Sequence, residues 1–391
     1  MLSGLLARPG IRDGLLGLGL LGCIVILLLY PAAAMEAAQS GLLLCFNVII
    51  PSLFPFFVLS NLLVELGMVS YLEKLLAPIM APLFRVPGAG GAALALGFVG
   101  GYPVGARTTL SLYEHGLCSR TQAERMLAFC NNSGPAFIFG VVGAGIFSSS
   151  KAGLMLYLAH AAASLCVGIL FRFYKASEPA ANNASLPRRA SAVPFPSAFT
   201  ASVKDSFSAT LNICSFVLFF TVTIRLLTLT GLFPALATLL SGFGMDPLLG
   251  ERLLTGLVEL SSGVSSLQAG GTGSRLELAA FMLGWAGLSV HCQVLSFLGG
   301  SGLSVKPYFI GKLLHGCLSA LFIAGLQQLF PLELPVSSAL TEQVETLTHL
   351  DFATALTIST TAAWLVWLLF FALALFAAWK NSGKRRRKVI E

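Results

Sequence analysis

The fold is decided by residues 119–147, which read SRTQAERMLAFCNNSGPAFIFGVVGAGIF. This stretch is long enough to cross ~30 Å of hydrocarbon as a helix, but the polar run Asn131-Asn132-Ser133-Gly134-Pro135 interrupts it about midway. Unpaired backbone groups are tolerated at that depth only when they are buried in protein or line a watery cavity. We therefore expect a broken membrane helix whose interruption faces the interior.

The interruption has the chemistry of a binding site. Ser133 is placed to cap the second half-helix, and Pro135 suits its first turn because its missing N–H costs nothing there. Asn131 and Asn132 add amide donors and acceptors, and Gly134 of the same run is included among the candidate binding residues. Such a half-helix aims its positive end at the midplane and can bind a carboxylate, carbonyl or hydroxyl. The alternative is a structural kink filled by neighbouring helices.

Composition indicates that the whole chain, and not only this segment, belongs to a membrane protein. Of 391 residues, 56% are hydrophobic and 10% are charged, against about 25% charged in soluble domains. Together with several apolar runs long enough to span lipid, these values exclude an ordinary cytosolic domain and predict an all-α polytopic membrane protein with about eight crossings. The eight cysteines form no C-x-x-C pair and no hydrolase or P-loop motif is present, so we expect no enzyme, no metal site and no cofactor.

The chain divides into six predicted segments. An N-terminal transmembrane helix (1–35) precedes a first unit (36–173), a cytoplasmic linker (174–202), a second unit (203–330), an external acidic loop (331–351), and a C-terminal transmembrane helix with a basic tail (352–391). The first helix also resembles a secretory signal, but we favour an uncleaved helix. The basic tail is typical of a cytoplasmic membrane terminus and does not indicate nucleic-acid binding.

The two units contain the same parts in the same order. Each has a predicted re-entrant hairpin, Gly88–Glu114 and Leu248–Gln268, followed by a broken helix, Ser119–Phe147 and Ser274–Phe297. At an offset of 155 residues, identical pairs include Ser149/Ser304 and His160/His315. With three crossings and one hairpin each, the two copies must be inverted repeats, and the distribution of Lys and Arg then predicts that both termini are cytoplasmic.

The second break supplies the opposite wall of the predicted site. It contains Ser289, His291 and Gln293, and polar side chains deep in a membrane helix usually face a bundle interior or a pathway. His291 is a ligand or a titrating group, or else a satisfied interhelical histidine. His160 and His315 each lie nine residues past a lysine, roughly 13 Å deep from opposite faces, where packing is the safer interpretation.

The hairpin turns complete the list of candidates. Tyr102 lies in the first turn, and Ser261 and Ser262 lie in the second. Glu259 is an intramembrane acid and therefore a functional candidate, either for a coupling proton or for a cation. Alternatively, it forms a structural ion pair with Arg107 or another base.

Several motifs in combination resemble a known family. They are Ile50-Pro51-Ser52-Leu53-Phe54-Pro55-Phe56-Phe57, Phe84-Arg85-Val86-Pro87-Gly88, Gly100-Gly101-Tyr102-Pro103-Val104-Gly105-Ala106, Asn131-Asn132-Ser133-Gly134-Pro135 and Gly287-Leu288-Ser289-Val290-His291. Over nearly the whole chain the sequence resembles the sporulation integral membrane protein YlbJ family, which carries the nucleoside-recognition Gate domain. The resemblance implies the hairpin and broken-helix core of concentrative nucleoside transporters. It also implies a role in endospore formation, moving dipicolinate across the outer forespore membrane, but it supplies no ligand residues.

These observations predict a carrier in the bacterial cell membrane that binds a small organic anion between two hairpins and two broken helices. Two alternatives stay open: a nucleoside or nucleobase carrier, and a non-transporting scaffold for spore envelope assembly. The expected partners are the solute and the lipid bilayer, and no nucleic acid is expected. The sequence does not determine the oligomeric state, and a homo-oligomer is one possibility.

Overall fold

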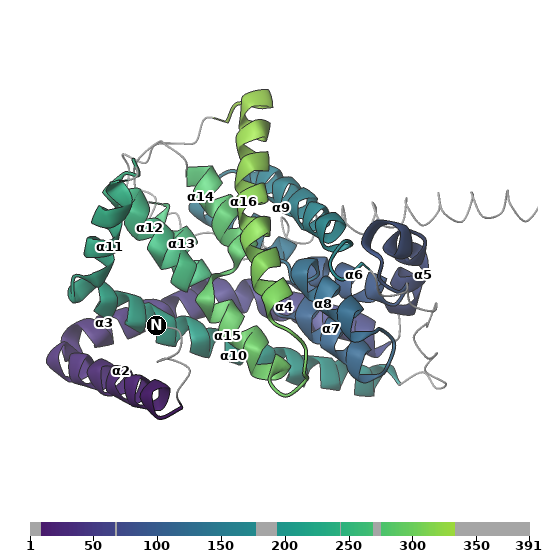
Figure 1. The fold of residues 1–391 in the computed structure, drawn as a ribbon, viewed down its shortest axis with the longest axis horizontal. Helices are drawn as coiled ribbons and strands as arrows, with labels where there is room; N and C mark the ends of the chain where they lie inside the picture. The colour runs from purple at the N-terminus through teal and green to yellow at the C-terminus, as the bar shows by residue number, and fades with distance from the viewer. Residues whose placement is uncertain (1–8, 67–68, 177–193, 243, 269–274, 333–391) are drawn as a thin grey trace, which may run out of the picture.

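Residues 9–66, 69–176, 194–242, 244–268 and 275–332 are described by a computed structural model, and all regular elements within them are helical (Figure 1). Helices are expected here because lipid offers no partners for backbone N–H and C=O groups. Four helices in these ranges are long and apolar enough to span a membrane, Ser150–Phe171, Phe195–Leu229, Arg275–Leu298 and Lys306–Leu329, and a bent N-terminal pair makes a fifth. The predicted C-terminal helix and nearly all of the acidic loop lie outside the described residues.

The N-terminal part departs from the predicted single helix. Helix α2 (Pro9–Leu29) and helix α3 (Pro31–Leu44) meet at 97° around Tyr30, inside the helix expected over residues 1–35. Pro31 disfavours a helical conformation in the residue before it, and Tyr30 has the non-helical angles φ −123° and ψ 52°. The chain then continues through a π-helical turn, η1 (Cys45–Ile49), into α4 (Ile50–Glu65).

The remaining elements of the first unit follow the predicted order. They are α5 (Val69–Ile79), η2 (Met80–Phe84), α6 (Gly90–Gly100), α7 (Val104–Glu114), α8 (Arg120–Phe129), η3 (Ala136–Ile146) and α9 (Ser150–Phe171). Helices α6 and α7 pack against each other, and with 11 residues each they rise only about 16 Å. They therefore form a hairpin too short to cross the bilayer.

The second unit repeats this order. Its elements are α10 (Phe195–Leu229), α11 (Leu232–Ser241), α12 (Pro247–Val258), α13 (Leu260–Ser266), α14 (Arg275–Trp285), α15 (Gly287–Leu298) and α16 (Lys306–Leu329). Two boundaries differ from the prediction. Helix α10 begins inside the predicted linker 174–202, and the hairpin turns at Glu259, two residues before Ser261, because Glu259 adopts an extended conformation.

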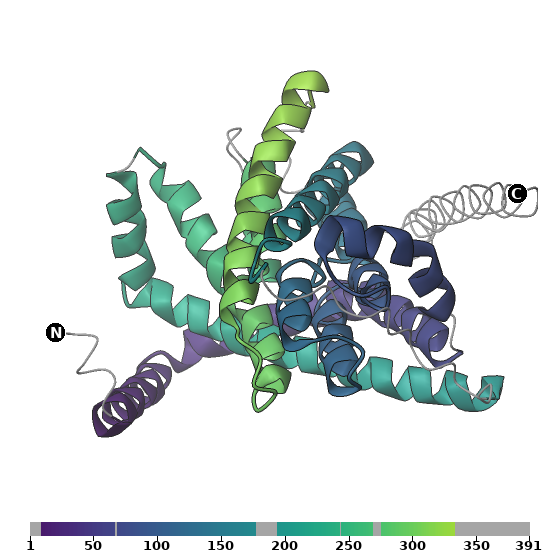
Figure 2. The ribbon, with the colours of Figure 1, turned by 45° about the vertical axis from the view of Figure 1, so that its right-hand side comes forward.

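The centre of the molecule is built from α8, α9, α14 and α16 (Figures 1 and 2). Helices α8, α9 and α14 each contact α16, and α9 also contacts α8 and α14. Glycines allow this close packing, as is common between membrane helices. A Cβ atom added at Gly284 would lie 2.5 Å from the Cα of Gly316, and one at Gly311 would lie 2.5 Å from the carbonyl oxygen of Ala128. The first and second units are thus in intimate contact.

Candidate functional site

Both hairpin turns and both helix breaks meet around one cavity. Its lining from these parts includes Tyr102, Ser133, Gly134, Glu259, Ser261, Ser289 and Gln293. All seven positions belong to the set expected from the sequence. About 620 Å³ of space lies between the atoms that surround the cavity, a figure that includes its open mouth.

The rest of the cavity lining is largely apolar. It includes Ile49, Leu53 and Phe57 from η1 and α4, and Ile213 and Val217 from α10. An apolar lining with a few hydrogen-bonding groups suits a solute that has both polar groups and an apolar face.

Glu259 holds the second hairpin turn together. Its Oε1 accepts a hydrogen bond from the backbone N–H of Ser261 at 3.1 Å, and its Oε2 accepts one from that of Ser262 at 2.6 Å. Ser289 Oγ of the second break lies 3.5 Å from Oε1. The carboxylate is 2% exposed and lines the cavity, so it is both a helix cap and the acidic group facing the solute space.

The ion pair between Glu259 and Arg107, considered as an alternative, is not formed. Arg107 is exposed, and its guanidinium carbon lies 5.5 Å from the centroid of the Phe297 ring. Glu259 is instead satisfied by amide and hydroxyl donors.

The first break is arranged differently from the expectation. The residue at the N-cap of η3 is Pro135, without a side-chain cap, and Ser133 contributes its backbone N–H, which donates to His160 Nε2 at 3.1 Å. Asn132 Nδ2 turns back and donates to the carbonyl oxygen of Phe129 at 3.0 Å. Asn131 and Asn132 are buried behind the cavity and are absent from its lining.

Two further candidates lie away from the cavity wall. His291 Nδ1 contacts the Tyr308 hydroxyl at 2.9 Å, and the ring packs edge-on against Trp285. Ser262 Oγ lies 3.2 Å from Thr221 Oγ1 of α10. Both residues therefore connect helices, which is the interhelical alternative considered for His291.

The two histidines at the 155-residue offset touch each other. The rings of His160 and His315 have their centroids 4.3 Å apart. His315 Nε2 donates to the carbonyl oxygen of His160 at 2.9 Å, since a carbonyl oxygen can only accept. Neither ring lines the cavity.

Lys312 is the residue that sequence reasoning missed. It lies six residues inside α16 and is fully buried. Its Nζ contacts Tyr102 Oη at 3.1 Å, the carbonyl oxygen of Asn131 at 2.9 Å and His315 Nδ1 at 3.3 Å. A lysine within an apolar span is itself a signal of function, and that signal was available in the sequence.

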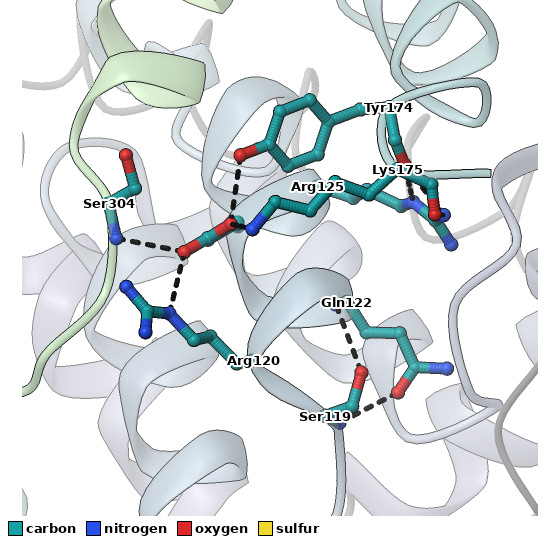
Figure 3. Close-up of polar contacts among 8 residues, drawn as sticks. Ser119, Arg120, Gln122, Arg125, Tyr174, Lys175 and Ser304 are labelled. Carbon is teal, nitrogen blue, oxygen red and sulfur yellow. Dashed lines mark hydrogen bonds and ion pairs between the residues drawn. The ribbon is translucent and has the colours of Figure 1, made fainter. Parts of the chain in front are cut away.

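A further buried charge, Glu124, connects the two units away from the cavity (Figure 3). The Glu124 side chain is fully buried; its Oε1 accepts from Arg120 Nε and from the backbone N–H of Ser304, each at 3.0 Å. Its Oε2 accepts from Tyr174 Oη and Lys175 Nζ, also at 3.0 Å. The hydrogen bond to Glu124 raises the pKa of Lys175 above its ordinary value. We call Arg120, Glu124, Tyr174, Lys175 and Ser304 the Glu124 cluster.

Hydrogen bonds from neighbouring residues hold the helix ends on either side of the Glu124 cluster. Ser119 and Gln122 form a capping box at the start of α8. The Arg125 guanidinium donates to the carbonyl oxygens of Tyr174, Lys175 and Arg85. The end of α9 is therefore held against the start of α8.

No group of three His, Cys, Asp or Glu side chains suited to a metal ion occurs among the residues that the structure describes. The polar groups of the cavity wall are hydroxyl, amide and carboxylate groups, which can donate or accept hydrogen bonds.

Comparison with known proteins gives three findings. Residues 46–172 match the Gate family model, described as nucleoside recognition. The sporulation integral membrane protein YlbJ of Bacillus subtilis (strain 168) is 36% identical over 322 residues, covering 75% of this chain and 78% of that protein. The structure of CNTnw in an inward-facing substrate-bound state is similar with a TM-score of 0.50 and 15% identity, over 84% of this chain and 89% of that one. A single-substitution variant of CNTnw in the intermediate 3 state also gives a TM-score of 0.50, with 14% identity over 84% of this chain and 90% of that one.

Proposed function

Because this chain belongs to the family of the sporulation integral membrane protein YlbJ and has the helical fold of a membrane transporter, we propose that it carries a small organic solute across a membrane during endospore formation. The observation that carries this proposal is the cavity at which two hairpin turns and two helix breaks meet. Interrupted helices near the middle of a membrane bundle are the usual site of solute binding in secondary transporters.

The first candidate solute is dipicolinate, as the family resemblance implies. It is a flat aromatic dicarboxylate, so its ring would lie against apolar lining residues such as Leu53, Phe57 and Val217 while its edge meets the polar lining groups. Its negative charges would then approach the Glu259 carboxylate. Because like charges repel strongly in a medium of low dielectric constant, an anion is expected to bind better when a proton neutralises Glu259. The proposal therefore includes coupling to a proton held by Glu259.

A nucleoside is the second candidate, and a specific observation favours it. Glu259 supplies carboxylate oxygens, and Gln293 Oε1 is a buried acceptor without a hydrogen-bond partner among the described residues. Sugar hydroxyl groups are donors and would satisfy such acceptors without any accompanying ion. The Gate domain, described as nucleoside recognition, points the same way.

Reconstituted protein separates these candidates. Purified protein in liposomes is assayed for uptake of radiolabelled dipicolinate and of radiolabelled uridine, with and without a pH gradient, against protein-free liposomes. We expect saturable dipicolinate uptake that increases when the entry side is acidic. Saturable uridine uptake without a pH effect would instead establish the nucleoside carrier.

The Ser289→Ala variant provides a further arm. Ser289 contacts Glu259 at the cavity, so S289A is expected to raise the half-saturating solute concentration. Absence of uptake for every solute, combined with normal sporulation of cells carrying S289A, would contradict a carrier and favour a scaffold.

A further inference from the structure

Lys312 is a fully buried cationic side chain surrounded by uncharged groups. Its three contacts, Tyr102 Oη, the Asn131 carbonyl oxygen and His315 Nδ1, lie on three different elements. They are the turn of the first hairpin, the break between α8 and η3, and α16 itself. No ion pair to Lys312 occurs among the residues that the structure describes.

The hydrogen-bond partners match a protonated amine. The Asn131 carbonyl oxygen can only accept, and the single proton of Tyr102 Oη is donated to the carbonyl oxygen of Leu283 at 2.5 Å. His315 Nε2 carries a proton because it faces the carbonyl oxygen of His160, and in a neutral ring Nδ1 is then an acceptor. With a neutral His315 all three partners accept, which matches the three N–H donors of a protonated lysine.

The Tyr102 contact is made at the hydroxyl end of the ring. Lys312 Nζ lies 3.1 Å from Tyr102 Oη and 4.8 Å from the centroid of the ring. The amine group thus has two oxygen neighbours and one nitrogen neighbour, and the lone pairs of such atoms can also contact a small monovalent cation.

The position of these contacts at a helix break suggests what Lys312 does. In transporters with broken helices, unwound backbone carbonyls coordinate the coupling ion. Here the Asn131 carbonyl, at such an interruption, is bound to an amine of the same chain. We propose that Lys312 is a tethered cation that permanently occupies a monovalent-cation site and joins the first hairpin turn to the first helix break, so that no inorganic cation is required there.

Chemical rescue tests this proposal without reference to any solute. Lys312→Ala removes the ammonium and leaves a space lined by the same acceptors, which methylammonium fits and tetramethylammonium does not. Thermal unfolding in detergent is measured for each variant in equal concentrations of the two chloride salts. We expect methylammonium to raise the midpoint of Lys312→Ala saturably, by about 2 °C or more, relative to tetramethylammonium.

Lys312→Met is the matched control. Its side chain fills the space but supplies no charge, so the two salts are expected to give equal midpoints, as they should for the unmodified protein. Equal midpoints in Lys312→Ala, or rescue of Lys312→Met to the same extent, would show that the residue contributes packing alone.

The unmodified protein supplies a separate arm should Lys312→Ala fail to fold. Its unfolding midpoint is compared in sodium, potassium and choline chloride at one ionic strength. We expect equal midpoints. A saturable stabilisation by sodium that is abolished in Tyr102→Phe would overturn the proposal, because it would show that an inorganic cation competes for these contacts. Failure of solute uptake in liposomes would leave these thermal results unaffected, so the two proposals are tested independently.

Discussion

The rings of His160 of the first unit and His315 of the second contact each other, with centroids 4.3 Å apart and ring planes tilted by 37°. They are separated by 155 residues, the same offset at which α8 corresponds to α14 and α9 to α16. In a pair of units related by a two-fold axis, equivalent residues touch each other only at that axis. We propose that the axis of an inverted repeat passes between these two rings.

Inverted repeats place equivalent residues on opposite faces of the membrane. Ser149→Cys and Ser304→Cys, each in a background without the eight native cysteines, are expected to react with a membrane-impermeant thiol reagent from opposite sides of oriented vesicles. Ser304 is expected to react on the cytoplasmic side. Labelling of both positions from the same side would exclude the inverted repeat.

Glu259 is expected to be required for coupling to protons. Glu259→Gln keeps an oxygen that can accept from the Ser261 or Ser262 amide but cannot release a proton. Solute uptake by this variant should therefore be the same with and without a pH gradient. Uptake that still follows the gradient would assign the proton to another residue.

Glu259→Ala separates coupling from stability. It removes the cap of α13 entirely, and the loss of an N-cap side chain costs about 1 kcal/mol. We expect a lower unfolding midpoint for Glu259→Ala than for Glu259→Gln, measured by thermal unfolding in the same detergent.

The hairpin α6–α7 has no room for added side chains where it meets the end of α8. A Cβ atom at Gly97 or Gly105 would overlap the carbonyl oxygen of Cys130. Because this contact involves backbone atoms on both sides, neither helix can relax by rotating a side chain. Gly97→Ala is expected to cost about 3 kcal/mol or more, visible as a large fall in the unfolding midpoint.

Gly325→Ala is the control for this prediction. Gly325 lies within α16 and an added Cβ would meet nothing within 4 Å. Since alanine favours a helix over glycine, this variant should be as stable as the unmodified protein or slightly more so. Equal midpoints for the Gly97 and Gly325 variants would contradict the close approach at Cys130.

The Glu124 cluster is expected to contribute to stability. Glu124→Ala leaves Arg120, Tyr174 and Lys175 without their common acceptor and removes the partner of the Ser304 amide. Because Arg120 and Lys175 are partly exposed and can be hydrated, the expected loss is about 1–3 kcal/mol, smaller than for a fully buried pair. A thermal midpoint unchanged in Glu124→Ala would show that water replaces the cluster.

The sequence predicted the fold well because its strongest signals are local. The polar run at residues 131–135 lies inside an apolar helix, and the two turns with Gly, Pro or Ser separate short apolar arms; both the breaks and the hairpins are present. The prediction of an all-helical membrane protein of this family is confirmed. The bend at Tyr30 was not predicted. The segments on either side of Pro31 are both apolar, so hydropathy alone does not separate them.

The site could be predicted only in part, because hydropathy and spacing give depth but not direction. Tyr102, Ser133 and Glu259 were expected at the cavity, and the structure brings them together there. Asn132 and His291 have equally suitable chemistry, but they bond to Phe129 and Tyr308 instead. Which way a polar side chain turns depends on partners from distant segments.

The two units are held together by far more than the chain that joins them. The ring pair of His160 and His315, the Glu124 to Ser304 bond and the packing of α16 on α8 and α9 all cross between them. We therefore expect that covalent continuity between residues 176 and 194 is dispensable. If residues 1–176 and 194–391 are co-expressed as separate polypeptides, the two halves should copurify through a tag on only one of them, and each half could then be exchanged or labelled independently.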